Sequence, residues 1–469
     1  MAPRARDSRE QRFGEYVERL AQALGHRDRH EPLRAYLTGL CLPGERKSIE
    51  PMAARVDPRH VRARHQSMHH LVANAPWDDA AMLRIARDVV LTEMDRHGPV
   101  AAWLVDDTGF PKKGQHSVGV AHQYCGTLGK QANCQVAVTV TLANEAVSVP
   151  AAYQLYLPES WARDGTRRRA AKIPTAVPFR PKWQIALKEI LALQADGAPM
   201  APVVADAGYG VGTEFRDALT AHRIPYVVGV REDTKVWPPG VTPRPPRRRR
   251  VRGRPPRRLQ GPASQPPVRL STLVGRLPLS TWSTVTWREG TRGSMRSRFV
   301  ALRIRPAHDR HRTEPRPVEW VLSEWPLGEP TPTKYYLSTL PESTPLATLV
   351  RLAHLRWRIE RDYQELKDEF GLDHFEGRGW RGFHHHGSLC IAPTPSWRPS
   401  APGFPPLSLC PSSEPLAYPE GSRRGGLPVR PERHVPTSIA TLYRLHGRAL
   451  LAATPCLACG SEPRAIGRL

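Results

Sequence analysis

Short apolar runs between residues 101 and 230 most constrain the fold of this chain. The runs AAWLV, SVGVAHQY, QVAVTVTL, VVADA and PYVVGVR have the length and composition of strands, and QVAVTVTL alternates clearly. Helical patterns lie near residues 182–195 and 212–221. Strands that follow one another and then alternate with helices predict an α/β fold, a mixed sheet flanked by helices.

Two of these runs lead into carboxylates. AAWLV is followed by Asp106 and Asp107, and VVA is followed by Asp206, so each strand is expected to deliver an acidic side chain at its end. A third isolated acidic residue, Glu360, lies in the charged helical segment RWRIERDYQELKDEF. Taken alone, Glu360 and the arginine four residues before it are typical of a solvated helix surface, but the two strand-end aspartates favour a shared site.

Isolated carboxylates on rigid elements suit a divalent metal. Mg²⁺ prefers hard oxygen ligands, and two such ions about 3.5–4 Å apart can activate a hydroxyl and neutralise the departing oxyanion of a phosphodiester. We therefore predict Asp106, Asp206 and Glu360 as catalytic metal ligands, with two Mg²⁺ as cofactors and Mn²⁺ able to substitute. Asp107 stays an alternative to Asp106, because strand alternation could place either side chain toward the metal.

The motifs together resemble those of the DDE insertion-sequence transposases, which have a ribonuclease H-like core. The resemblance is to the subgroup whose third acidic residue lies in a Y-x2-R-x3-E-x6-K signature, which Arg356, Glu360 and Lys367 match, with Ala353 in place of Tyr. The stretches VDDTGFPKKGQHSVGVAHQYCGTLGKQANCQ, VVADAGYG and KYYLSTLP are also similar to this family. The resemblance covers about residues 10–390. It implies a ribonuclease H-like fold, Mg²⁺-dependent cleavage and transfer of DNA strands, and a homodimer when bound to DNA.

Composition agrees with a nucleic-acid partner. The formal net charge is +25, which attracts the phosphate backbone of double-stranded DNA, here the terminal repeats of the element and the target DNA. Arg356, Lys367, Lys112 and Lys113 are predicted to bind that DNA, Arg356 as a fork and the lysines as point charges. The alternative explanation of the positive charge is a GC-rich coding region, which raises the arginine content.

No apolar run approaches the roughly 20 residues of a membrane span, and the Arg-rich start lacks the apolar segment of a secretory signal. We therefore expect a soluble intracellular protein with no membrane partner, and the resemblance implies that it is bacterial, cytoplasmic and nucleoid-associated.

Shifts in composition predict five parts. Residues 1–95 form a helical domain, which either recognises the element ends or serves as scaffold, and 96–230 form the first part of the ribonuclease H-like core. Residues 231–340 form a β-rich insertion, and 341–390 return to the core with the Glu360 helix. Residues 391–469 contain fourteen Pro, no Lys and no Asp, so they are expected to be disordered or out of frame.

Three smaller features carry open alternatives. Residues 241–270 hold ten Arg and eight Pro with no acidic residue, which fits a basic linker or a segment that enters a narrow A·T minor groove. Four tryptophans in the second part of the insertion are either all core residues or include one that stacks on a flipped base: Trp282, Trp287, Trp320 and Trp325. The histidines 384–386 are expected to border a DNA groove or solvent.

Two other functions fit the same residues. A nuclease of this fold would stop at hydrolysis without strand transfer, and an inactive remnant would only bind DNA. The intact carboxylates argue against the remnant, whereas the unusual tail argues for it.

Overall fold

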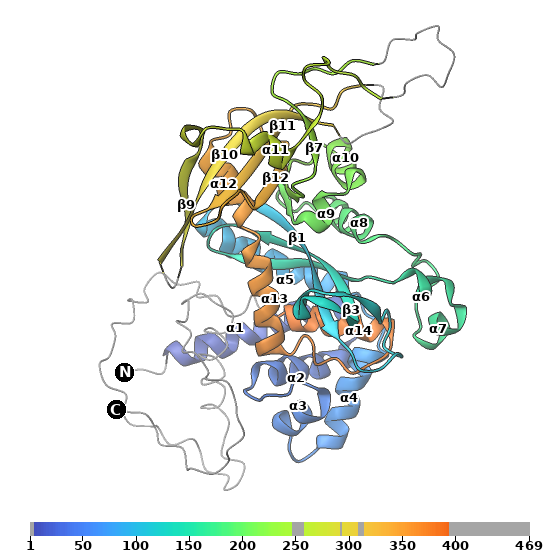
Figure 1. Cartoon of the computed structure of the whole chain (residues 1–469). Coiled ribbons are helices and arrows are strands. Elements are labelled where there is room, and N and C mark those ends of the chain that lie inside the picture. Colours follow the sequence, from blue (N-terminus) through green and yellow to red (C-terminus); the bar gives the residue numbers. More distant parts are fainter. Residues whose placement is uncertain (1–3, 246–257, 291–292, 308–313, 394–469) are drawn as a thin grey trace, which may run out of the picture.

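One continuous sheet of twelve strands forms the body of the computed structural model, and helices cover it (Figure 1). The structure describes residues 4–245, 258–290, 293–307 and 314–393. Residues 394–469 of the predicted tail and the centre of the Arg/Pro-rich segment fall outside these ranges. Within the described ranges no helix is long and apolar enough to cross a membrane.

The amino-terminal part is helical, as its periodicity predicts. Its helices bury leucines and methionines on one side and expose arginines and glutamates on the other. They are α1 (Arg4–Ala21), α2 (His30–Cys41), α3 (Ile49–Val56), α4 (Val61–Ala73) and α5 (Asp79–Met94).

Five strands of the sheet have the arrangement of a ribonuclease H-like core. Their spatial order is β4-β3-β1-β5-β6, in which β3 is antiparallel to both β4 and β1, and β5 and β6 are parallel to β1. This confirms the predicted mixed sheet. With the edge strand β2, they are β1 (Ala102–Pro111), β2 (Ala121–Cys125), β3 (Lys130–Ala143), β4 (Ser148–Leu155), β5 (Val203–Ala205) and β6 (Tyr226–Val230).

Strand β4 is absent from the sequence-based expectation, because Pro150 interrupts its apolar run. Proline cannot donate to a sheet ladder and is therefore restricted to edge strands, strand starts and bulges. In β4 the proline lies where the register against β3 shifts, between Val140 and Thr141. The irregularity accommodates Pro150 and leaves the rest of the pairing intact.

The helices between β4 and β6 include the two predicted near 182–195 and 212–221. Helices α8 and α10 pack their apolar residues on one face of the sheet. Figure 1 shows α6 and α7 projecting away from the sheet. The helices are α6 (Glu159–Arg163), α7 (Gly165–Ala170), α8 (Lys182–Ala195), α9 (Ala207–Gly210) and α10 (Thr213–Ala221).

The β-rich insertion extends the core sheet. Strand β12 pairs antiparallel with β6, and β11 and β10 continue outward from it. The insertion contains β7 (Lys235–Trp237), β8 (Val268–Arg269), α11 (Leu270–Gly275), β9 (Ser283–Gly290), β10 (Gly293–Pro306), β11 (Glu319–Pro326) and β12 (Lys334–Ser338). A strand ladder therefore connects it to the strands that carry the aspartates.

Three helices follow the insertion: α12 (Leu346–His354), α13 (Trp357–Phe370) and α14 (Trp380–Ile391). Apolar residues of α13 and α14 share one hydrophobic core with α1, α2, α4 and one face of the sheet. The proposed boundary at residue 95 is thus crossed by a common core. All four boundaries between the five predicted parts stay predictions.

The three consecutive histidines of α14 are buried, so the expectation that they border a DNA groove or solvent is wrong. Successive helical residues point in different directions. His384 accepts a backbone N–H from β4. His385 stacks on Trp77 with 3.7 Å between ring centroids, and His386 bonds the Tyr36 hydroxyl. Each histidine anchors α14 to a different neighbour.

Candidate functional site

Strand β1 places its two adjacent aspartates on opposite faces of the sheet. Leu104 belongs to the core on the α13 face, whereas Trp103 and Val105 belong to the core on the α8 face. Because side chains alternate along a strand, Asp106 faces α13 and Asp107 faces α8. Both lie within β1 and not at its end, since the strand continues to residue 111. The apolar run ends at residue 105, but pairing with β3 carries the strand further.

Asp206 is brought beside Asp106 by the parallel pairing of β5 with β1. Val105 and Ala205 are the last paired residues, and Asp206 follows at once. Its carboxylate accepts the backbone N–H of Tyr209 at 3.3 Å and so caps α9. The predicted strand-end position of Asp206 is therefore the observed one.

Helix α9 can lie close to β6 because residue 210 is glycine. A Cβ there would be 2.0 Å from the carbonyl oxygen of Gly229. This contact explains the second glycine of the DAGYG stretch. It also fixes the turn that Asp206 caps.

Arg356 lies where α13 begins and joins the carboxylates. Its Nη1 donates to Oδ2 of Asp106 at 2.6 Å, and its Nη2 donates to Glu360 on the next turn. Asp206 is close enough to act on it electrostatically. The Asp106 side chain is 19% exposed and that of Glu360 is 55% exposed, so the site runs from the sheet to the surface.

Charge and burial compete at this site. Burial raises the pKa of Asp106 to about 7, Arg356 opposes the rise, and the neighbouring Asp206 adds to it. Burial disfavours the charged guanidinium, but the carboxylates of Asp106, Glu360 and Asp206 outweigh it and raise the pKa of Arg356. The arginine therefore neutralises a group of acidic side chains that would otherwise repel one another.

The oxygen donors of Asp106, Asp206 and Glu360 are of the kind that Mg²⁺ prefers. Among the described residues, however, no three His, Cys, Asp or Glu side chains are grouped closely enough to hold an ion. The guanidinium of Arg356 lies between two of the carboxylates. These oxygen donors are therefore of the type that binds Mg²⁺. An ion bound jointly by Asp106 and Glu360 would have to displace the guanidinium of Arg356.

The other predicted DNA-binding residues differ in accessibility. Lys367 donates to the carbonyl of Gly109 and the hydroxyl of Thr127, both at 2.9 Å, and burial lowers its pKa. Lys112 donates to the carbonyl of Phe375 at 2.7 Å, and burial lowers its pKa as well. Lys113 is exposed. The first two amines hold protein segments together in this structure, so a phosphate contact would require them to exchange partners.

A second polar group, on the α8 face, was missed from the sequence. The carboxylate of Asp107 accepts the hydroxyl of Tyr209 and pairs with Lys182 at 2.6 Å. Tyr209 is buried and Lys182 is the first residue of α8. The only sequence signal was the position of Tyr209 three residues after Asp206.

The insertion tryptophans make both packing and cationic contacts. Trp282 is buried and meets Trp325 edge to face, with ring centroids 5.3 Å apart. Trp287 stacks on His354 at 4.0 Å. Trp320 lies under the guanidinium of an arginine of β10. The role of one of them in stacking a flipped base stays a prediction.

Comparison with known proteins gives two matches. The profile of a family described as DDE superfamily endonuclease matches residues 19–294. A probable transposase for insertion sequence element IS701 from Microchaete diplosiphon is 31% identical over 169 residues. That alignment covers 36% of this chain and 41% of the relative's own length. The family match includes Asp106 and Asp206, and it ends before Arg356 and Glu360.

Proposed function

Because the chain belongs to the DDE superfamily of endonucleases, we propose that it is a transposase that binds the terminal repeats of its insertion sequence and cleaves and transfers DNA strands. The observation that carries this proposal is the convergence of Asp106, Asp206 and Glu360 on Arg356. Carboxylates from three separate elements share one partly exposed site. The similarity to a probable transposase supports the same reaction class.

The three carboxylates are proposed to hold two Mg²⁺, with Mn²⁺ able to substitute. When bound, these ions would make water or a freed 3′-hydroxyl nucleophilic and would neutralise the departing oxyanion. Asp106 and Asp206 are set by the β1–β5 pairing, so their spacing is held by backbone hydrogen bonds. Glu360 is the exposed residue of the first turn of α13 and is proposed to complete the set from the surface.

Arg356 is proposed to change partners during the reaction. Without an ion its guanidinium neutralises Asp106 and Glu360. Once the carboxylates are occupied, the two-pronged guanidinium is free to bind two oxygens of a DNA phosphate, for which its geometry is suited. One residue thus keeps the acidic site stable before DNA arrives and binds the DNA afterwards.

Asp107 is assigned a positioning role and Asp106 the metal-binding role. Asp107 is already held by Tyr209 and Lys182 on the face away from Arg356. Those contacts tie β1 to α8 and to α9, the short helix that Asp206 caps. A ligand on that face would be separated from Glu360 by the sheet.

The remaining assignments follow from the reaction. Lys112, Lys113 and Lys367 are proposed to contact the DNA backbone near the site, with Lys113 accessible at the outset. Joining two element ends to one target requires two active sites, so the DNA-bound protein is proposed to be a homodimer. A chain that acts on chromosomal DNA in bacteria is proposed to be cytoplasmic and nucleoid-associated.

The test is a strand-transfer assay with the full chain, labelled DNA carrying the flanking terminal repeat, a target plasmid and Mg²⁺. Glu360→Gln should abolish both the cut and the joined product. Glu214→Gln is the matched control, because Glu214 is also an exposed glutamate in the first turn of a helix. It should leave both products unchanged.

Other outcomes separate the alternatives. Cleavage without any joined product would favour a nuclease of the same fold. Binding of the repeat without cleavage would favour an inactive remnant. Equal amounts of product from the wild type and Glu360→Gln would show that Glu360 is not part of the active site.

A further inference from the structure

Helices α3 and α4 form a compact pair on the surface of the amino-terminal part. Four residues, 57–60, connect them, and the turn is fixed because the Asp57 carboxylate accepts the backbone N–H of His60 at 3.2 Å. Met52 of α3 packs closely on Gly39 of α2. A Cβ added to Gly39 would lie 2.9 Å from the Cβ of Met52. Two short helices joined by a tight turn on a third helix are the arrangement in which the second helix can enter the major groove of DNA.

The outward face of α4 has the chemistry to read DNA. Its inner side is buried through Met68, Leu71 and Val72. Its exposed side carries basic and amide groups at helical spacing, beside Ala63, and no acidic residue: Arg59 just before the helix, then Arg62, Gln66, His69 and His70. Arg and Gln are the side chains that pair bidentately with guanine and adenine edges in the major groove.

The carboxyl-terminal end of α4 is held by the helix that follows the catalytic segment. Arg381 of α14 donates to the carbonyl of Asn74 at 2.7 Å, and His385 of α14 contacts the carbonyl of Val72 at 3.0 Å. These contacts satisfy carbonyls that a helix end leaves unpaired. The outward face remains uncovered within the described part of the chain.

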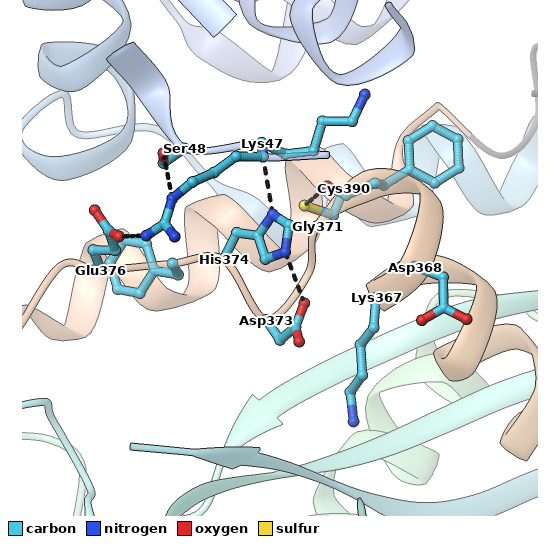
Figure 2. A network of polar contacts seen from close by, with 12 residues as sticks. Lys47, Ser48, Lys367, Asp368, Gly371, Asp373, His374, Glu376 and Cys390 are labelled. Carbon is cyan, nitrogen blue, oxygen red and sulfur yellow. Dashed lines mark hydrogen bonds and ion pairs between the residues drawn. The ribbon is translucent and has the colours of Figure 1, made fainter. Parts of the chain in front are cut away.

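The chain leading into α3 is fastened to the loop after α13, as Figure 2 shows. The backbone N–H of Lys47 donates to Nδ1 of His374 at 3.0 Å. Arg46 bonds Ser48 and forms an ion pair with Glu376. Since this loop directly continues the helix that carries Glu360, the α3–α4 pair is positioned relative to the acidic site through a few short connections.

A hollow of about 380 Å³ lies beside α4 and is walled on its other side by the same loop. His65 and His69 of α4 and Phe375 and Arg378 of the loop line it. A helix in the major groove has a sugar–phosphate strand on each side. Glu50 and Glu376 also line the hollow, so its lining is of mixed charge, and Arg378 is the group at its edge that suits a phosphate of one of these strands.

We propose that α4 is the helix that reads the terminal repeat, with Arg62 and Gln66 on base edges and Arg59 and Arg378 on phosphates. This inference rests on the proposed function for its substrate and adds the surface that selects it. Its probe is duplex DNA alone, so it is testable without catalysis.

The experiment measures binding of the full chain in EDTA to two duplexes, one with the element's end and one with a shuffled sequence of the same composition. Gln66→Ala and Arg62→Ala should lower the preference for the element end at least about fivefold each. Their affinity for the shuffled duplex should fall less. Gln184→Ala and Arg19→Ala alter exposed helical residues elsewhere and should keep the full preference.

Arg59→Ala should weaken binding to both duplexes equally and reduce the slope of log affinity against log salt by about one. Unchanged preference in Gln66→Ala and Arg62→Ala would overturn the inference, as would a wild type that does not distinguish the two duplexes. Thermal melts check that these surface variants fold. Failure here leaves the Glu360→Gln cleavage result untouched, so the two proposals fall separately.

Discussion

His386, a buried histidine of α14 that contacts the loop after α13, gives a quantitative prediction. His386 is 3% exposed; its Nδ1 lies 2.8 Å from the Tyr36 hydroxyl and its Nε2 lies 3.1 Å from the carbonyl of Gly371. A neutral ring that donates from Nε2 and accepts at Nδ1 satisfies both partners. Burial lowers the pKa of His386 from 6.5 to about 4. The folded state therefore binds this proton more weakly than the unfolded state.

The sign and size of the effect follow from linkage. Between pH 6.5 and 4 the unfolded chain holds a proton that the folded chain lacks, so stability is full above pH 6.5 and falls as the pH drops. Each pH unit in this window is worth about 1.4 kcal/mol. Lowering the pH from 7 to 5 should thus remove about 2 kcal/mol through His386 alone.

His386→Gln keeps an N–H for the Gly371 carbonyl but has no proton to gain. The variant should be less stable than the wild type at pH 7, and its loss of stability from pH 7 to pH 5 should be smaller by about 2 kcal/mol. Urea unfolding followed by tryptophan fluorescence at both pH values measures the difference. His116→Gln at an exposed position is the control and should keep the wild-type pH dependence. Equal pH dependence in His386→Gln and the wild type would refute the reasoning.

Three further predictions concern the acidic site and its supports. Arg356→Gln removes the guanidinium that lies between two carboxylates, so Mn²⁺ should bind more tightly without DNA while cleavage falls; titration calorimetry and a cleavage assay measure the two effects. Gly210→Ala puts a Cβ 2.0 Å from the carbonyl of Gly229 and should cost at least about 2 kcal/mol, seen as a lower melting temperature. Tyr209→Phe removes the buried hydroxyl that donates to Asp107 and should cost about 1–3 kcal/mol in urea unfolding.

Each of these predictions has a matched control at an exposed position: Arg351→Gln, Gly114→Ala and Tyr124→Phe. The controls should resemble the wild type. Mn²⁺ affinity that is unchanged in the arginine variant would contradict competition between guanidinium and metal. Wild-type stability in the glycine or tyrosine variant would contradict the corresponding contact.

Local patterns were enough to predict most of the core. The apolar runs before Asp106 and Asp206 form strands, as expected for apolar runs that are too short for a buried helix. The helix of Glu360 follows from its charged 3.6-residue periodicity. These elements supplied the candidate carboxylates before any tertiary contact was known.

The remaining features of the fold and the site depend on tertiary contacts. Which aspartate faces Glu360 depends on the direction in which β1 enters the sheet, which alternation alone does not determine. The burial of His386 depends on α14 packing against α2, a contact between residues 350 positions apart. The strand with Pro150 is recognisable only once its pairing with β3 is known. The bridging position of Arg356 likewise requires β1 and α13 to be placed together.

Asp106, Asp206 and Glu360 are proposed to act as one metal-dependent unit. The most direct test is the Mg²⁺-dependent cleavage rate of a preassembled complex with element-end DNA, for Asp106→Asn, Asp206→Asn, Glu360→Gln and the triple variant. Groups that act as a unit are strongly non-additive, so each single change should lower the rate by about 10³-fold or more and the triple change should lower it little further. A single variant that keeps a near-wild-type rate, or losses that multiply in the triple variant, would contradict the account.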